Sequence, residues 1–117
     1  MLNGLHFVMA HVPDVEEATR FYTETLGMTV TDSQPDFVQF AAPGGGAILA
    51  LGKGSAIAPP ESIELWWFVD SADAMHDALV ARGVQNATPV IDEPFGRTFT
   101  FKDPAGNTLS ILQPAQA

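Results

Sequence analysis

The two halves of this 117-residue chain repeat the same order of elements, and this repetition constrains the fold more than any other feature. In each half a short apolar strand leads into an amphipathic helix that ends at a glycine, and three strand-like segments follow. The end of the strand and the glycine are Val12 and Gly27 in one half and Val69 and Gly83 in the other, separated by 15 and 14 residues. We therefore predict an internal duplication of a βαβββ module.

In the first half, Asp14 is placed to cap a helix, and Glu17 stands three residues later as a capping box requires. Gly27 supplies the stop. The glycine run 44–46 is interpreted as a hairpin turn and not as a phosphate-binding loop, because the Lys-Ser/Thr tail and a following helix are absent. The predicted elements are a strand at 5–12, a helix at 15–26 and strands at 28–32, 36–42 and 47–52.

In the second half, Asp70 or Ser71 is expected to cap the helix, and Gly83 ends it. The segment between the halves, KGSAIAPP, has little pattern and ends in two prolines, which is typical of a linker. The predicted elements are strands at 62–69, 84–91, 97–102 and 108–113 around a helix at 71–82. The predicted boundaries are a first module at 1–52, a linker at 53–60 and a second module at 61–117, together one compact domain.

Composition excludes several functional classes. Hydrophobic residues make up 46% of the chain, enough for a normal core. Lys and Arg total 5 against 14 Asp and Glu, and the formal net charge of −9 opposes binding that depends on phosphate contacts, so no nucleic acid partner is expected. Absence of cysteine removes disulfides, thiolate nucleophiles and sulfur-ligated metal sites. No signal peptide or membrane span is visible, and a cytoplasmic protein with no membrane partner is the default expectation.

The repeated module predicts an α+β fold in which two modules face each other around a cavity. One helix can cover only one face of a four-stranded sheet and leaves the other face exposed to solvent. Two such sheets can cover these remaining faces by packing against each other. In the first strand, Val8, Ala10 and Val12 are then expected beneath the helix, with the alternate residues directed into the space between the sheets. That space is a candidate ligand cavity.

Two stretches carry a resemblance to a known family. HVPDVEEATRFYTETLGM, residues 11–28, resembles the strand-to-helix signature of the vicinal oxygen chelate superfamily, and GRTFTFKDPAGNTLSIL, residues 96–112, resembles its closing hairpin. This superfamily includes glyoxalase I, extradiol dioxygenases, fosfomycin-resistance enzymes and bleomycin-resistance proteins. The similarity covers nearly the whole chain and implies the fold, but the family hosts unrelated chemistries.

The resemblance also implies where a metal would be held, because metal-dependent members place one ligand on each of four strands. In this chain those positions are Phe7, Ala50, Glu64 and Ser110. His6 is one residue out of register and is expected on the opposite face. Three of the four positions lack the family's imidazole or carboxylate donors, so we expect no metal ligands and no cofactor.

Three other polar residues leave alternatives open. His11 shares the face of Phe7 and could approach Glu64, or it could be an ordinary polar residue at a strand end. His76 is interpreted as a helix-surface or packing histidine. Arg97 could bind an anionic group of a ligand, although a structural ion pair with one of the many acids is the preferred interpretation.

The remaining cavity positions predict an aromatic wall with one carboxylate. Trp66 would be a stacking platform, and Glu64 would attract a cation or accept a hydrogen bond. The alternative to ligand binding is that the aromatic side chains only fill a core between the sheets and no ligand exists. The predicted ligand-binding residues are Phe7, Met9, His11, Ile48, Ala50, Glu64, Trp66, Phe68, Phe95, Ser110 and Leu112.

The leading hypothesis is a metal-free binding protein of the bleomycin-resistance type, which sequesters an aromatic or cationic small molecule at the interface of its modules. The alternative is a glyoxalase-like lyase or isomerase in which Glu64, desolvated beside aromatic side chains, acts as a general base. A third reading is an interaction module without a ligand. The resemblance and the exposed sheet edges favour a homodimer.

Overall fold

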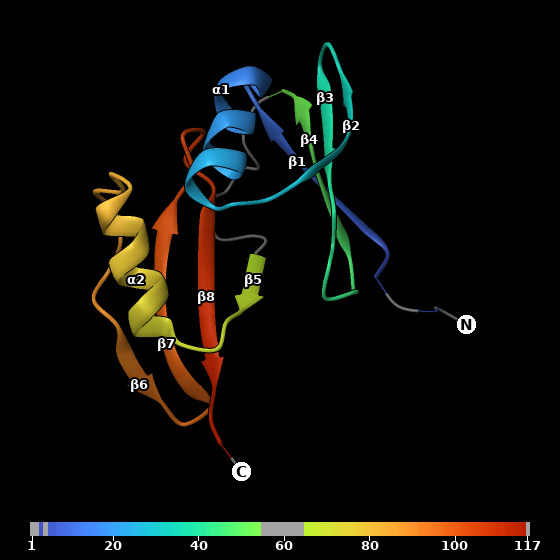
Figure 1. Ribbon diagram of the computed structural model, residues 1–117. Coiled ribbons are helices and arrows are strands. Elements are labelled where there is room, and N and C mark those ends of the chain that lie inside the picture. The colour runs from blue at the N-terminus through green and yellow to red at the C-terminus, as the bar shows by residue number, and fades with distance from the viewer. Residues whose placement is uncertain (1–2, 4, 55–64, 117) are drawn as a thin grey trace. The chain divides into compact units, whose positions relative to one another are not determined.

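A computed structural model describes residues 3, 5–54 and 65–116 of the chain. The chain divides into two compact units, 1–57 and 58–117, each with one four-stranded mixed sheet. The strand order is β1-β4-β3-β2 in the first unit and β5-β8-β7-β6 in the second, so the two sheets have the same topology (Figure 1). The α+β duplication expected from the sequence is confirmed.

The first unit contains one parallel strand pair and two antiparallel ones. The parallel pair joins β1 and β4, which lie on either side of the helix in the sequence, and β3 pairs with both β4 and β2. The elements are β1 (Phe7–Val12), α1 (Val15–Arg20), η1 (Phe21–Thr25), β2 (Val30–Gln34), β3 (Phe37–Phe40) and β4 (Ile48–Lys53).

The predicted first helix is present, but its second half is wider than an α-helix. The Asp14 carboxylate accepts a hydrogen bond from the amide of Glu17 at 3.0 Å, as predicted for the cap. The amide of Leu26 donates to the carbonyl of Phe21, five residues back, which is the π-helical pattern of η1. Gly27 then ends the helix with a φ of +75°.

The core of the first unit lies between this helix and one face of the sheet. Ala10 and Val12 of β1 are buried there, as the alternation in the sequence predicted. The rings of Tyr22 and Phe40 pack at a centroid distance of 5.5 Å, and both are fully buried. Burial of a side chain such as that of Phe40 contributes about 1.5–3 kcal/mol to stability. The helix is therefore favoured on the face of the sheet that carries this ring.

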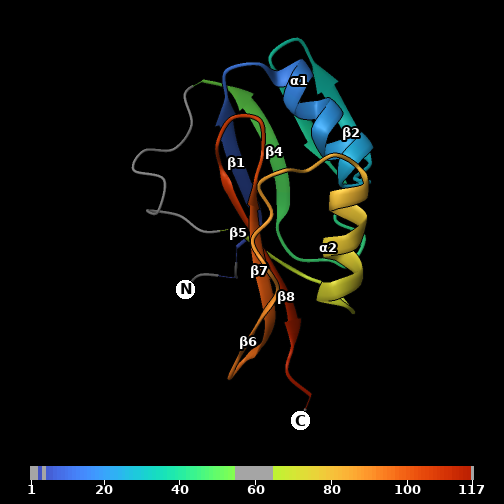
Figure 2. The ribbon, with the colours of Figure 1, turned by 90° about the vertical axis from the view of Figure 1, so that its left-hand side faces the viewer.

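The second unit repeats this plan with a longer helix. Helix α2 contacts β7 and β8, and it runs beside them in Figure 2. Leu79 of the helix packs into a core with Phe99 and Phe101, whose ring centroids are 6.2 Å apart. The elements are β5 (Leu65–Phe68), α2 (Ala72–Ala81), β6 (Ile91–Glu93), β7 (Gly96–Lys102) and β8 (Thr108–Pro114).

The strand predicted at 84–91 is wrong, because regular pairing begins only at Ile91. Pro89 lacks an amide hydrogen and cannot donate to a ladder. Upstream, side chains take over part of the pairing: the amide of Thr100 donates to the Thr88 hydroxyl, and the amide of Lys102 donates to the Asn86 side-chain carbonyl. The segment therefore follows β7 without forming a strand.

Two further boundaries differ from the sequence prediction. The strand expected at 28–32 is β2, which extends to Gln34, so residues expected in a turn are paired with β3. The strand expected at 62–69 is seen as β5, and its first three residues lie outside the described part of the chain. Within the described residues, no helix is long and apolar enough to cross a membrane.

Candidate functional site on the helix-free sheet faces

Each sheet has one face covered by its helix and one helix-free face, and the predicted ligand-binding residues that the structure describes belong to the helix-free faces or, for Phe95, to an adjoining turn. In the first unit the pairing of β1 with β4 places Phe7 beside Ile48 and Met9 beside Ala50. Because strand residues alternate between faces, these side chains lie opposite the buried Ala10. Phe7 and Met9 are exposed, as expected for side chains away from the helix.

Glycines on β4 and just beyond it form a floor for Met9 and His11. A Cβ atom added to Gly52 would lie 2.8 Å from the sulfur of Met9, and one added to Gly54 would lie 3.2 Å from Cβ of His11. Both side chains therefore approach the backbone of the neighbouring chain segment closely. Neither glycine is among the residues predicted for the site, although Gly52 pairs with His11 in the strand register.

The second helix-free face is aromatic. Trp66 and Phe68 of β5 alternate with Leu65 and Trp67, and the exposed fractions of Trp66 and Phe68 are 43% and 77%. Phe95, from the turn between β6 and β7, is 51% exposed and meets Trp66 edge-on, with a centroid distance of 6.3 Å and an interplanar angle of 72°. This geometry is the favoured T-shaped arrangement of two aromatic rings.

The small residues of these faces are covered by their neighbours. Ser110 is paired with Trp66 on one side and Thr100 on the other and is only 2% exposed, and Ala50 is fully buried. The accessible surface is thus supplied by the large side chains. Leu112, also predicted, pairs with Phe68 on β5.

Two residues of the second face were missed by the sequence analysis. Thr98 and the exposed Ile91 pair with each other in the ladder between β7 and β6, and Thr98 also pairs with Leu112. The Thr98 hydroxyl donates to the carbonyl of Ile111 at 2.8 Å. Alternation along β7 was the available signal for Thr98.

The side chains at the family's metal positions do not fit a metal ion. The phenyl ring of Phe7 and the methyl group of Ala50 have no lone pair to donate, and the neutral hydroxyl of Ser110 is a poor substitute for a carboxylate. Glu64, the fourth position, lies outside the described residues. Across ranges 5–54 and 65–116, no group of three or more His, Asp or Glu side chains is arranged to hold an ion.

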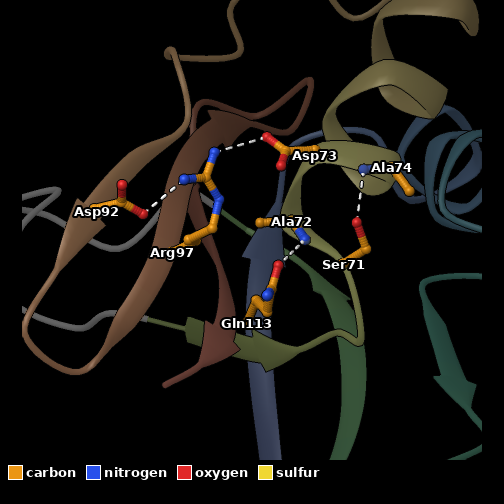
Figure 3. Close-up of polar contacts among 7 residues, drawn as sticks. All are labelled: Ser71, Ala72, Asp73, Ala74, Asp92, Arg97 and Gln113. Atoms are coloured by element: carbon orange, nitrogen blue, oxygen red, sulfur yellow. Dashed lines mark hydrogen bonds and ion pairs between the residues drawn. The ribbon is translucent and has the colours of Figure 1, made fainter. Parts of the chain in front are cut away.

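Arg97 lies on the helix side of its sheet and forms ion pairs, as the sequence analysis preferred. Its two terminal nitrogens contact Asp73 of α2 at 2.9 Å and Asp92 of β6 at 2.6 Å (Figure 3). The hydrogen bond to Asp73, and then that to Asp92, raise the pKa of Arg97 above its ordinary value, so the guanidinium stays protonated. Because the pKa of Arg97 is raised, the guanidinium's contribution to stability is complete at neutral pH and is lost as the pH rises into strong alkali.

The two candidate histidines have different surroundings. The ring of His76 packs edge-on against Phe99 at a centroid distance of 5.0 Å, which supports its interpretation as a packing residue. His11 lies on the helix-free face above Gly52 and Gly54 and is exposed.

Comparison with known proteins identifies the family. The sequence profile of the Glyoxalase/Bleomycin resistance protein/Dioxygenase superfamily matches residues 4–111. The chain belongs to this superfamily. No curated protein matches the sequence.

Solved structures with the same fold include proteins that bind antibiotics. TnmS3, an antibiotic binding protein from Streptomyces sp. CB03234, is 31% identical, with a TM-score of 0.84 over 97% of this chain and 98% of that one. The bleomycin-binding protein from bleomycin-producing Streptomyces verticillus, solved with copper(II)-bleomycin, is 26% identical, with a TM-score of 0.72 over 98% of each chain. Lactoylglutathione lyase from Agrobacterium tumefaciens is 16% identical, with a TM-score of 0.76 over 96% of this chain and 94% of that one, and shares the fold.

Proposed function

We propose that this protein binds and sequesters a small aromatic or cationic molecule through its helix-free sheet faces, without a metal ion. The observation that carries the proposal is the edge-on pair of Trp66 and Phe95 beside the exposed ring of Phe68. Large apolar side chains gathered on one exposed face are typical of an interaction site. A planar ligand would contact these rings and gain both apolar burial and aromatic stacking.

The chemistry of the remaining residues supports binding over metal-assisted catalysis. Phe7 and Ala50 place apolar side chains at positions where metal-dependent relatives need donors. We assign Glu64 the role of attracting a positive charge on the ligand, consistent with the net charge of −9. The antibiotic-binding and bleomycin-binding proteins support the same class of function, since each is more than a quarter identical to this chain.

Replacement of Trp66 tests the proposal. We expect Trp66→Ala to weaken the binding of proflavine, a planar aromatic cation, by about tenfold, which corresponds to about 1.4 kcal/mol of lost stacking and burial. Isothermal titration calorimetry measures the dissociation constant. Trp67→Phe is the matched control, because Trp67 lies on the helix side of the sheet. This variant should bind proflavine with the affinity of the natural protein.

Two results would contradict the proposal. Equal proflavine affinity in the natural protein and in Trp66→Ala would remove the aromatic face from ligand binding. Elemental analysis of protein purified without chelator tests the metal-free part, and about one tightly held divalent ion per chain would overturn it.

A further inference from the structure

Phe95 lies at the tip of a tight turn, where an exposed aromatic ring needs external restraints to keep one orientation. Glu93 and Gly96 pair across the end of the β6–β7 hairpin, leaving only Pro94 and Phe95 as the connecting residues. Phe95 is half exposed, yet its ring meets Trp66 in a defined T-shaped geometry. Contacts around the turn therefore determine where this ring stands.

The backbone of the turn is restrained on the side of β8. The amide of Ala115 donates to the carbonyl of Phe95 at 2.9 Å. Gly96 adopts a φ of +147°, and a Cβ atom there would collide with the carbonyl oxygen of Gln113. The turn thus lies directly against the backbone at the end of β8.

Arg97 restrains the same turn on the side of β6. It follows Gly96 directly, and its Nη1 donates to Oδ1 of Asp92, the residue paired with it in the ladder. Its Nη2 donates to Oδ1 of Asp73, so one planar guanidinium joins β7 to both β6 and the first turn of α2 (Figure 3). Its Nε is buried and has no hydrogen-bond partner among the residues that the structure describes. The two terminal nitrogens therefore set the orientation of the group.

The two carboxylates that contact Arg97 have separable roles. Asp73 belongs to α2, which is also attached to β8 by a hydrogen bond from the amide of Ala72 to the side chain of Gln113 at 3.0 Å. Asp92 is two residues before Pro94, in the three-residue strand that leads into the turn. We therefore expect loss of Asp73 to loosen mainly the helix, and loss of Asp92 to loosen mainly the hairpin that carries Phe95.

We propose that Arg97 is a positioning residue for ligand binding: through Asp92 it holds the β6–β7 turn so that Phe95 stands against Trp66. This role rests on the proposed function, because it concerns the same aromatic face. Arg97 itself is on the opposite face of the sheet and acts through Phe95. The consequence is that a substitution on the helix side changes affinity on the helix-free side.

The first test compares Asp92→Ala with Asp73→Ala. A partly exposed ion pair has a modest effect, so we expect Asp92→Ala to weaken proflavine binding about threefold by lowering the fraction of molecules with Phe95 in place. Asp73→Ala should lower the melting temperature and weaken proflavine binding less than Asp92→Ala does, because Arg97 keeps its bond to the strand that leads into the turn. Equal losses of affinity in the two variants would mean that Arg97 has only a general structural role, and would overturn the proposal.

A double-mutant cycle gives the decisive measurement. If Arg97 and Asp92 act through Phe95, the threefold effect of Asp92→Ala should disappear when Phe95→Ala is already present. A threefold loss that persists in the Phe95→Ala background would overturn the proposal.

A measurement without ligand separates this inference from the proposed function. Near-ultraviolet circular dichroism reports the packing of Trp66, and its signal should fall in Asp92→Ala and Phe95→Ala, and fall less in Asp73→Ala. If proflavine binds to neither the natural protein nor its variants, the proposed function fails for this probe. The spectra still test whether Arg97 and Asp92 hold Phe95 against Trp66, because they need no ligand. An unchanged spectrum in Asp92→Ala would overturn it.

Discussion

Gly96 is the residue where the backbone of the second unit tolerates a side chain least. Its φ of +147° is unfavourable for any residue with a Cβ atom, and the added atom would also meet backbone at Gln113, which cannot rotate away. The same chain offers a position with only the first of these problems. Gly106 has a φ of +89°, and no atom of the described residues lies within 4 Å of where its Cβ would be.

We therefore expect Gly96→Ala to destabilise the protein by about 3 kcal/mol, since backbone strain and a steric collision add together. Gly106→Ala should cost only about 1 kcal/mol, from strain alone. Urea denaturation monitored by far-ultraviolet circular dichroism gives both values. Equal losses of unfolding free energy in the two variants would show that the turn at Gly96 shifts to avoid the collision with the backbone of β8.

At the scale of elements, α2 depends on contacts at its N-terminus. The hydroxyl of Ser71 accepts a hydrogen bond from the amide of Ala74 at 3.1 Å, and the side chain of Gln113 accepts one from the amide of Ala72. These two bonds satisfy amides that no helical carbonyl can reach. One is local and the other comes from β8, so the cap also fixes the helix to its sheet.

We expect Ser71→Ala to lower the free energy of unfolding by about 1 kcal/mol, because the amide of Ala74 loses its acceptor. Ser71→Asp is the matched control, since its carboxylate can accept the same bond at the positive end of the helix dipole and should retain the stability. Thermal unfolding followed by circular dichroism distinguishes them. Equal melting temperatures for Ser71→Ala and the natural protein would show that Gln113 alone maintains the helix start.

At the scale of the whole molecule, the net charge of −9 acts on any charged ligand. We expect proflavine, a cation, to bind more tightly than anthracene-9-carboxylate, a planar anion of similar size. The difference should shrink as the screening length falls from about 30 Å at 0.01 M salt to about 3 Å at 1 M salt. Fluorescence titration across this range measures both affinities, and a preference that does not respond to salt would show that overall charge is not its source.

Most of the fold was predictable from the sequence because each half carries complete local signals. Asp14 and Ser71 cap their helices, Gly27 ends the first one, and alternation along β1 and β5 assigns the faces of both sheets. The error at 84–91 arose where this logic fails, because side chains there replace backbone groups in the pairing with β7. Such bonds depend on tertiary position and leave no periodic pattern.

The candidate site was predictable only in part. Alternation placed Trp66 and Phe68 together, and both are exposed on the second helix-free face. The contact between Phe95 and Trp66, and the attachment of Arg97 to two acids, join residues that are distant in the sequence and share no period. The domain boundaries, the homodimer, the cytoplasmic location and the role of Glu64 stay predictions.

The alternation along β5 has a consequence for how such a protein could change over generations. Leu65 and Trp67 lie on the helix side of the sheet, while Trp66 and Phe68, their immediate neighbours, lie on the helix-free face. Selection for binding a new compound could therefore replace the side chains on the helix-free face, while those on the helix side continue to pack in the core. Alternate residues of this one strand would thus determine ligand preference and fold stability separately.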